Sequence, residues 1–125
     1  ENKIVIKIKK EVKEVFEYSI DPAHTPLWSS SITKEETNEW PVRMGTVYKN
    51  SNSEGKWSEY VVSGFERNKI FELTSEDGNY HVRYTYSSND AGTVMEYFEW
   101  VDNGELDEPY DRKHLEKLRN LIEAI

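Results

Sequence analysis

Tyrosine is the residue type whose number and spacing most clearly suggest a chemical role in this sequence of 125 residues. Among the eight tyrosines, Tyr84 and Tyr86 alternate with polar residues, and Tyr97 lies in a second alternating segment. Residues two apart in a strand share one face of a sheet, so we place Tyr84 and Tyr86 inward. Inward aromatic residues commonly fill a core, but a buried phenol without a hydrogen-bond partner costs about 1–3 kcal/mol. Several inward tyrosines therefore favour a pocket that holds water or a ligand with polar atoms.

One carboxylate falls into the same alternating pattern. Met95, Tyr97 and Glu99 share one face of the last predicted strand, and the opposite face is equally apolar. With the first set inward, Glu99 would be a pocket carboxylate able to act as a general acid or base. The competing interpretation, which we favour for Glu99 alone, is an edge position that reaches solvent.

The usual catalytic and metal-binding motifs do not occur in the sequence. His24, His81 and His114 lie far apart, have no metal-ligand spacing and are expected at the surface. There is no glycine-rich phosphate loop and no Gly-x-Ser-x-Gly elbow, and the serines at 29–31 fit a helix end. We therefore assign no catalytic residue, no metal and no cofactor, and we expect binding rather than catalysis.

The charge and composition of the chain limit the binding partners and the cell compartment that we expect. The formal net charge of −8 disfavours phosphate backbones, so nucleic acid is not an expected partner. No segment approaches the roughly 20 apolar residues of a membrane span, so membrane insertion is not expected. The absence of cysteine and of an apolar leader at the start of the sequence favours the cytoplasm. We expect one domain over residues 1–125, as a monomer or weak homodimer.

The elements that must position these residues follow from hydrophobic periodicity. Residues 3–9 alternate as a half-buried strand, and residues 11–20 have helical spacing. Asp21 and Pro22 predict the cap and first position of a short second helix that carries Trp28 and ends near residues 29–31. Strands are predicted at 32–37, 46–50, 57–65, 70–75, 80–87 and 93–101, joined by short turns that make neighbours antiparallel. A final helix, capped by Asp107 or Asp111, completes an α+β arrangement.

Several local motifs, in this order, resemble the START-like superfamily, also called SRPBCC. The segments are Val15-Phe16-Glu17-Tyr18 with Asp21-Pro22 and Trp28, then Pro41 to Tyr48, Val62 to Glu66, and Gly92-Thr93. The resemblance covers essentially the whole chain. It implies the helix-grip fold, a curved antiparallel sheet of about seven strands wrapped around the C-terminal helix, with two short helices after the first strand. The final helix has only about four turns, which is short for the family, so its cavity is expected to be shallow or partly open.

The resemblance implies a small apolar or amphipathic ligand, of a lipid-like or polyketide-like kind, between sheet and helix. Combined with strand alternation, it predicts a set of cavity-lining residues: Trp28, Tyr48, Tyr60, Val62, Phe71, Leu73, Val82, Tyr84, Tyr86, Met95, Tyr97, Glu99, Leu115, Leu118 and Ile122.

Two alternatives and one local choice remain open. The chain could be a cyclase or dehydratase that uses Glu99 and Tyr97 in the pocket. It could instead be a protein-interaction module resembling the co-chaperone activators of the heat-shock ATPase, with a patch of Trp40, Phe98 and Trp100. Trp28 either plugs the fold or, as we favour, gates the pocket mouth with its indole N–H free for water or ligand.

Overall fold

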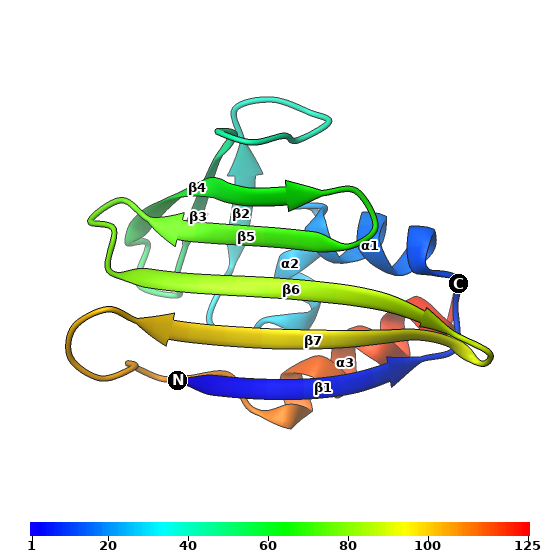
Figure 1. Ribbon diagram of the computed structural model, residues 1–125. Coiled ribbons are helices and arrows are strands. Elements are labelled where there is room, and N and C mark those ends of the chain that lie inside the picture. Colours follow the sequence, from blue (N-terminus) through cyan, green and yellow to red (C-terminus); the bar gives the residue numbers. More distant parts are fainter.

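Seven strands form one antiparallel sheet in the computed structural model, which describes residues 1–125 (Figure 1). Their order across the sheet is β1-β7-β6-β5-β4-β3-β2, so the first strand closes against the last. The sheet curls, and β3 and β2 turn toward the side that carries the helices (Figure 1). The strands are β1 (Asn2–Ile8), β2 (Lys34–Thr37), β3 (Val47–Ser51), β4 (Trp57–Glu66), β5 (Ile70–Ser75), β6 (Tyr80–Asn89) and β7 (Gly92–Val101).

Three helices cover one face of this sheet: α1 (Val12–Ile20), α2 (Thr25–Trp28) and α3 (Arg112–Glu123) (Figure 1). The apolar stripe of α3 is fully buried through Leu115, Leu118 and Ile122. Asp111 caps the helix, since its carboxylate accepts the backbone N–H of His114 at 3.2 Å. The predicted α+β helix-grip architecture is confirmed. None of the helices has the length and apolar character needed to cross a membrane.

The long alternating strands place their side chains as predicted. In β1 the isoleucines at 4, 6 and 8 are buried and the residues between them are exposed. In β7, Met95, Tyr97 and Glu99 are buried, and the intervening residues are half-buried on the outer face. The register pairs Ile6 with Met95 and Asn2 with Glu99. The inward assignment of this β7 face is therefore confirmed.

A β-bulge in β4 changes which residues of that strand face inward. Val62 pairs with Leu73, but Gly64 pairs with Glu72, so Ser63 is the extra residue. Strict alternation along the strand would place Gly64 on the same face as Val62, and the bulge moves it to the other face. Beyond the bulge, Phe65 takes the inward position and its ring packs edge-on against Phe16 at 5.7 Å.

The second helix starts later than predicted. Asp21 does not cap it; the Asp21 carboxylate accepts the backbone N–H of Ala23 at 2.9 Å and forms a tight turn. The helix runs from Thr25 to Trp28, with Pro26 within its first positions. The other predicted boundaries lie within two residues of the observed ones.

Candidate ligand-binding pocket

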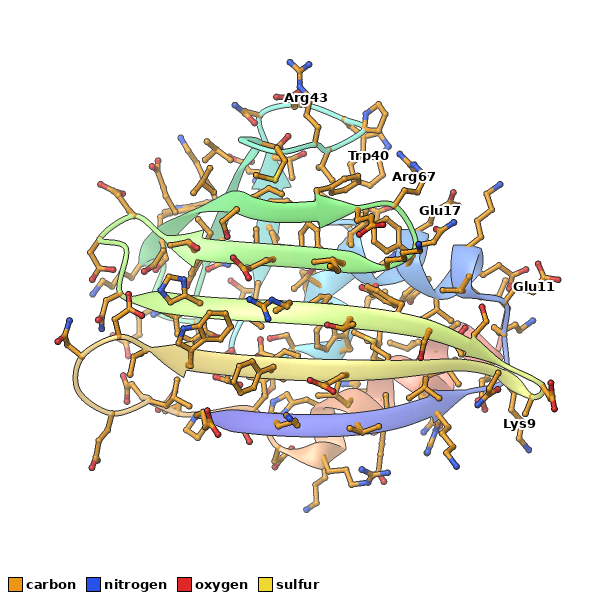
Figure 2. All side chains as sticks on the ribbon, in the orientation of Figure 1. Lys9, Glu11, Glu17, Trp40, Arg43 and Arg67 are labelled. Atoms are coloured by element: carbon orange, nitrogen blue, oxygen red, sulfur yellow. The ribbon has the colours of Figure 1, made fainter.

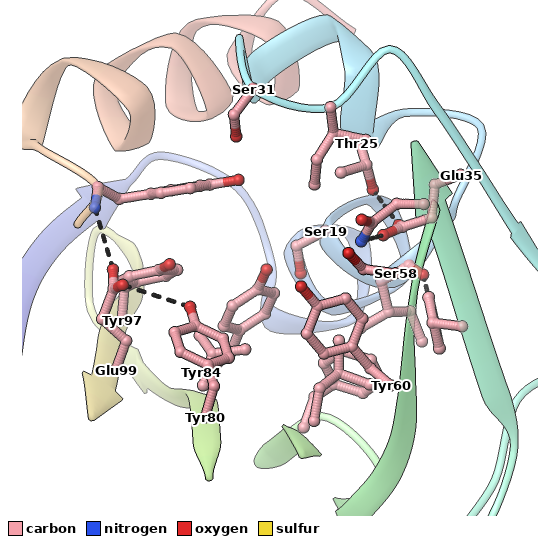
Figure 3. Close-up of a pocket in the computed structure, with 18 of the residues that line it drawn as sticks. Ser19, Thr25, Ser31, Glu35, Ser58, Tyr60, Tyr80, Tyr84, Tyr97 and Glu99 are labelled. Carbon is pink, nitrogen blue, oxygen red and sulfur yellow. Dashed lines mark hydrogen bonds between the residues drawn. The ribbon is translucent and has the colours of Figure 1, made fainter. Parts of the chain in front are cut away.

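A pocket of about 310 Å³ lies between the curved sheet and the helices (Figure 3). Strands β2 to β7 supply most of its walls, and α1, α2, the loops after α2 and after β3, and the segment before α3 supply the rest. Exposed residues, among them Ser31, Asp107 and Glu108, form its mouth. The pocket lies over the predicted sheet face, but the expectation that the C-terminal helix α3 forms its other wall is wrong, because no residue of α3 lines it.

The predicted lining residues divide into two groups in the structure. Eight line the pocket: Tyr48, Tyr60, Phe71, Leu73, Val82, Tyr84, Tyr97 and Glu99. Seven do not line it and are buried in the apolar core: Trp28, Val62, Tyr86, Met95, Leu115, Leu118 and Ile122. The three α3 residues pack among the core side chains and so stay apart from the open space. Ligand binding by the first group stays a prediction.

Trp28 lies in the position of a plug. Its side chain is 1% exposed and packs edge-on against the rings of Tyr84 and Tyr110. The indole N–H is buried and has no hydrogen-bond partner. The gate expectation required this N–H to be open to water or ligand, and it is wrong for this structure.

Six tyrosines line the pocket, and their hydroxyl groups differ in how they are satisfied: Tyr48, Tyr60, Tyr80, Tyr84, Tyr97 and Tyr110. Tyr48 donates to the carbonyl of Ile20 at 2.6 Å, and the Tyr110 hydroxyl is hydrogen-bonded to Ser29. The Tyr84 side chain points into the pocket, and its hydroxyl has no hydrogen bond within the protein (Figure 3). Burial raises the pKa of Tyr84 and of Tyr97 well above the usual range, so both phenols stay neutral donors.

Glu99 lies inside the fold rather than at an edge that reaches solvent. It is 2% exposed, which makes our solvent-facing expectation wrong. Its carboxylate accepts from the Asn2 side chain at 3.2 Å, from the backbone N–H of Tyr110 at 3.1 Å and from the Tyr80 hydroxyl at 3.3 Å. These three neutral donors offset part of the cost of burying the carboxylate.

A second carboxylate, Glu35, stands on the opposite side of the pocket (Figure 3). It accepts from the Thr25 hydroxyl at 2.6 Å and from the Asn50 side chain at 3.2 Å. Burial outweighs these two donors and raises its pKa from 4.5 to about 7. Sequence reasoning missed Glu35 because the strand is short and charged on both faces, with no apolar alternation around it.

The other lining residues that sequence reasoning missed are mostly polar and come from loops, strands and the ends of α1 and α2. They are Ser19, Ile20, Thr25, Ser31, Ile32, Asn50, Asn52, Ser58, Tyr80, Asp107, Glu108 and Tyr110. Tyr80 had a usable signal, because it shares a strand face with Val82 and Tyr84. Tyr110 had none, since it follows a loop without periodicity.

The histidines are half-buried and structural rather than freely exposed. His24 stacks on Tyr18, and His114 completes the cap of α3. His81 stacks on Trp100 and bonds the carboxylate of Asp102 at 3.0 Å. These contacts give each ring a local packing partner that the sequence spacing did not reveal.

The aromatic residues proposed for a protein-binding patch do not form one surface. Trp40 is 55% exposed and lies near Arg67 and Glu17, beside the β4–β5 end of the sheet (Figure 2). Phe98 and Trp100 stack on each other on the outer face of β7. Lys3 and Arg83 cover those two rings in part. The patch therefore lacks the continuity that the interaction hypothesis required.

Comparison with known proteins gives matches in structure and not in sequence. No family model matches the chain, and no curated protein matches it. A protein of Mesorhizobium loti superimposes with a TM-score of 0.71 at 16% identity, covering 98% of each chain. An AHSA1-like protein of Aeromonas hydrophila gives 0.68 at 15% identity, covering 98% of this chain and 92% of its own.

A polyketide cyclase-like protein of Corynebacterium glutamicum gives a TM-score of 0.61 at 22% identity, over 80% of this chain and 64% of its own. Identities this low establish a shared fold and leave the activity open. The chain has the helix-grip, START-like fold that AHSA1-like and polyketide cyclase-like proteins share.

Proposed function

We propose that this protein binds a compact amphipathic molecule in the pocket between its sheet and helices. The observation that carries the proposal is the unsatisfied hydroxyl of Tyr84, which faces the cavity from a residue that is only 8% exposed. A phenol hydroxyl in this position can hydrogen-bond to water in the pocket or to a polar atom of a ligand that displaces this water. The apolar side chains of Phe71, Leu73 and Val82 lie beside it and suit an apolar ligand body.

The size of the pocket limits the ligand. A volume of about 310 Å³ lies at the lower end of the range for small-molecule sites and equals the space of roughly ten water molecules. One or two rings with a polar group fit such a space, whereas a long-chain lipid does not. We therefore propose a ligand of about 10–15 non-hydrogen atoms, at the small end of the lipid-like and polyketide-like range.

Titration with 2-naphthol, a neutral two-ring phenol, tests the proposal. Amide NMR should show saturable shifts concentrated in β5, β6 and β7, whose inner faces line the pocket. Val82→Phe places extra volume inside the pocket and should abolish these shifts. Thr85→Phe adds the same phenyl ring to the outer face of this strand and should leave the shifts unchanged. Thermal melts confirm that both variants fold.

Two results would contradict binding in this pocket. One is the absence of saturable shifts at millimolar 2-naphthol. The other is an equal response from the Val82→Phe and Thr85→Phe proteins, because it would place the naphthol elsewhere.

Acid–base catalysis on the bound molecule is a second candidate, and the pKa of Glu35 is the observation that favours it. A pocket carboxyl with a pKa of about 7 can both accept and donate a proton near neutral pH. Exchange of the α-hydrogens of 2-tetralone in heavy water, followed by NMR, tests for such a base. Wild-type protein should accelerate exchange with a rate that rises through pH 7, and Glu35→Gln should not. Equal rates in both proteins would dismiss catalysis by Glu35.

A further inference from the structure

The charged residues that line the pocket are all acidic. Glu35 and Glu99 lie on opposite walls (Figure 3). Asp107 and Glu108 are exposed lining residues at the mouth. No lysine, arginine or histidine is among the 21 lining residues. An anionic ligand would meet four carboxylates here and no compensating cation, so the pocket disfavours carboxylates and phosphates.

Neither inner carboxylate has a basic partner anywhere in the protein. Nine ion pairs form on the surface and between strands, and none of them includes Glu35 or Glu99. Their donors are hydroxyl, amide and backbone N–H groups, all neutral. A buried carboxylate such as Glu99 is normally paired with a cation, and Glu35 is half-buried against the same cavity, so a counter-charge is the component that this pocket lacks. The acidic and histidine side chains do not gather in a group of three that could hold a metal ion.

The tyrosines provide a second and independent indication. Tyr84 is only 8% exposed, and its hydroxyl faces the pocket without a hydrogen-bond partner in the protein. Its ring packs against that of Tyr97 at 5.6 Å, and the Tyr97 ring in turn stacks on Tyr110 at 5.3 Å, so these rings cover one another and the Tyr84 hydroxyl is the group left for the cavity. A phenol oxygen can accept a hydrogen bond from an ammonium group, as a carboxylate does. The acidic side chains and the Tyr84 hydroxyl therefore suit the same kind of ligand group.

We propose that the ligand of this pocket is an organic cation, with an ammonium group on an apolar body of one or two rings. The proposal rests on the binding function argued above and specifies its ligand class. The ammonium would lie between the inner carboxylates and beside the Tyr84 hydroxyl, and the apolar body would contact Phe71, Leu73 and Val82. The raised pKa of Glu35 is consistent with a site that lacks its cation in the empty protein.

Three probes of matched shape test the charge preference at pH 8: 3-phenylpropylamine, 3-phenyl-1-propanol and 3-phenylpropionate. We expect the amine to bind at least about tenfold more tightly than the alcohol, as one charge-assisted hydrogen bond implies, and the acid to bind most weakly. Amide NMR gives both the affinity and the place of binding. Glu35→Gln should reduce the amine-to-alcohol affinity ratio toward one.

Glu36→Gln is the matched control, because it removes one charge at the neighbouring, exposed position and changes the net charge equally. An unchanged affinity ratio in this variant would support the inference, since general attraction to an acidic protein cannot then explain the preference. Alcohol binding as tight as amine binding, or tightest binding by the acid, would overturn the cation proposal and leave the pocket's binding function intact. No binding of any probe at millimolar concentration would overturn both.

Discussion

Replacing Glu35 with glutamine should make the empty protein more stable above pH 7. The wild-type carboxyl has a pKa of about 7 in the folded protein, against 4.5 in the unfolded chain. The folded state therefore binds this proton more tightly, and the wild-type protein loses stability as pH rises from 4.5 through 7. Glutamine keeps an acceptor for Thr25 and has no charge to bury. The phenols that face Glu35, Tyr48 and Tyr60, have raised pKa values and stay neutral throughout this range.

The magnitude follows from the pKa difference. At about 1.4 kcal/mol per pKa unit, the change from 4.5 to about 7 corresponds to roughly 3 kcal/mol of destabilisation at high pH. Because the side chain also faces water in the pocket, we expect roughly 2 kcal/mol to be measured. For a domain of this size, that free energy corresponds to a melting temperature about 5–10 °C higher than wild type.

Thermal melts of wild type, Glu35→Gln and Glu36→Gln at about pH 4.5 and pH 8.5 provide the assay. We expect a gain for Glu35→Gln at the higher pH, little difference at the lower pH, and no pH-dependent gain for Glu36→Gln. A Glu35→Gln protein that melts at or below the wild-type temperature at the higher pH would refute the reasoning. That result would mean that ionising Glu35 does not destabilise the folded protein, because solvent or a partner absent from the structure stabilises the charge.

Three further predictions concern other parts of the fold. Trp28→Ala should lower the free energy of unfolding by about 3–5 kcal/mol, because the side chain fills the core. A melting temperature within about 2–3 °C of wild type would contradict the role of Trp28 as a plug. Tyr84→Phe should leave the melting temperature nearly unchanged, because the hydroxyl has no partner within the protein, but should weaken 2-naphthol binding about 2- to 10-fold in an NMR titration; equal affinity would exclude that contact. Gly92→Ala should lower the melting temperature strongly, because an added Cβ would lie 2.3 Å from the carbonyl oxygen of Ile8 at a φ of +142°. At Gly78 an added Cβ meets open space, so Gly78→Ala should cost only about 1 kcal/mol, and equal losses in the two variants would refute the clash.

The fold was predictable where strands alternate without interruption. In β1 every second residue is an isoleucine, so its inward face follows directly. In β7 both faces carry apolar or aromatic residues, and the inward face of Met95, Tyr97 and Glu99 was chosen with the help of the family resemblance. The capping residue Asp111 was one of the two candidates that the sequence offered, since aspartate is favoured before the first turn of a helix. The bulge at Ser63 was not readable, because an extra residue leaves the composition of the strand unchanged and only shifts its pairing.

The pocket was predictable only in part, because alternation reveals the face of a residue and not its depth. Met95 and Tyr97 are two positions apart on one face, yet Tyr97 borders the open space and Met95 lies in the solid core. That difference depends on where the helices cover the sheet. Glu35 was missed for another reason, since nothing local distinguishes it from Glu36. Its role depends on Thr25 and Asn50, which lie on other elements.

The contact of Trp28 with Tyr84 and Tyr110 has a practical use in spectroscopy. Both tyrosines line the pocket, so an occupant that moves either ring changes the surroundings of a fully buried indole. Of the other three tryptophans, Trp40 and Trp57 are exposed and respond to quenchers dissolved in water. With those two quenched, the remaining emission comes from Trp28 and the half-buried Trp100. A Trp100→Phe protein would isolate Trp28 as an intrinsic fluorophore that follows pocket occupancy without a label.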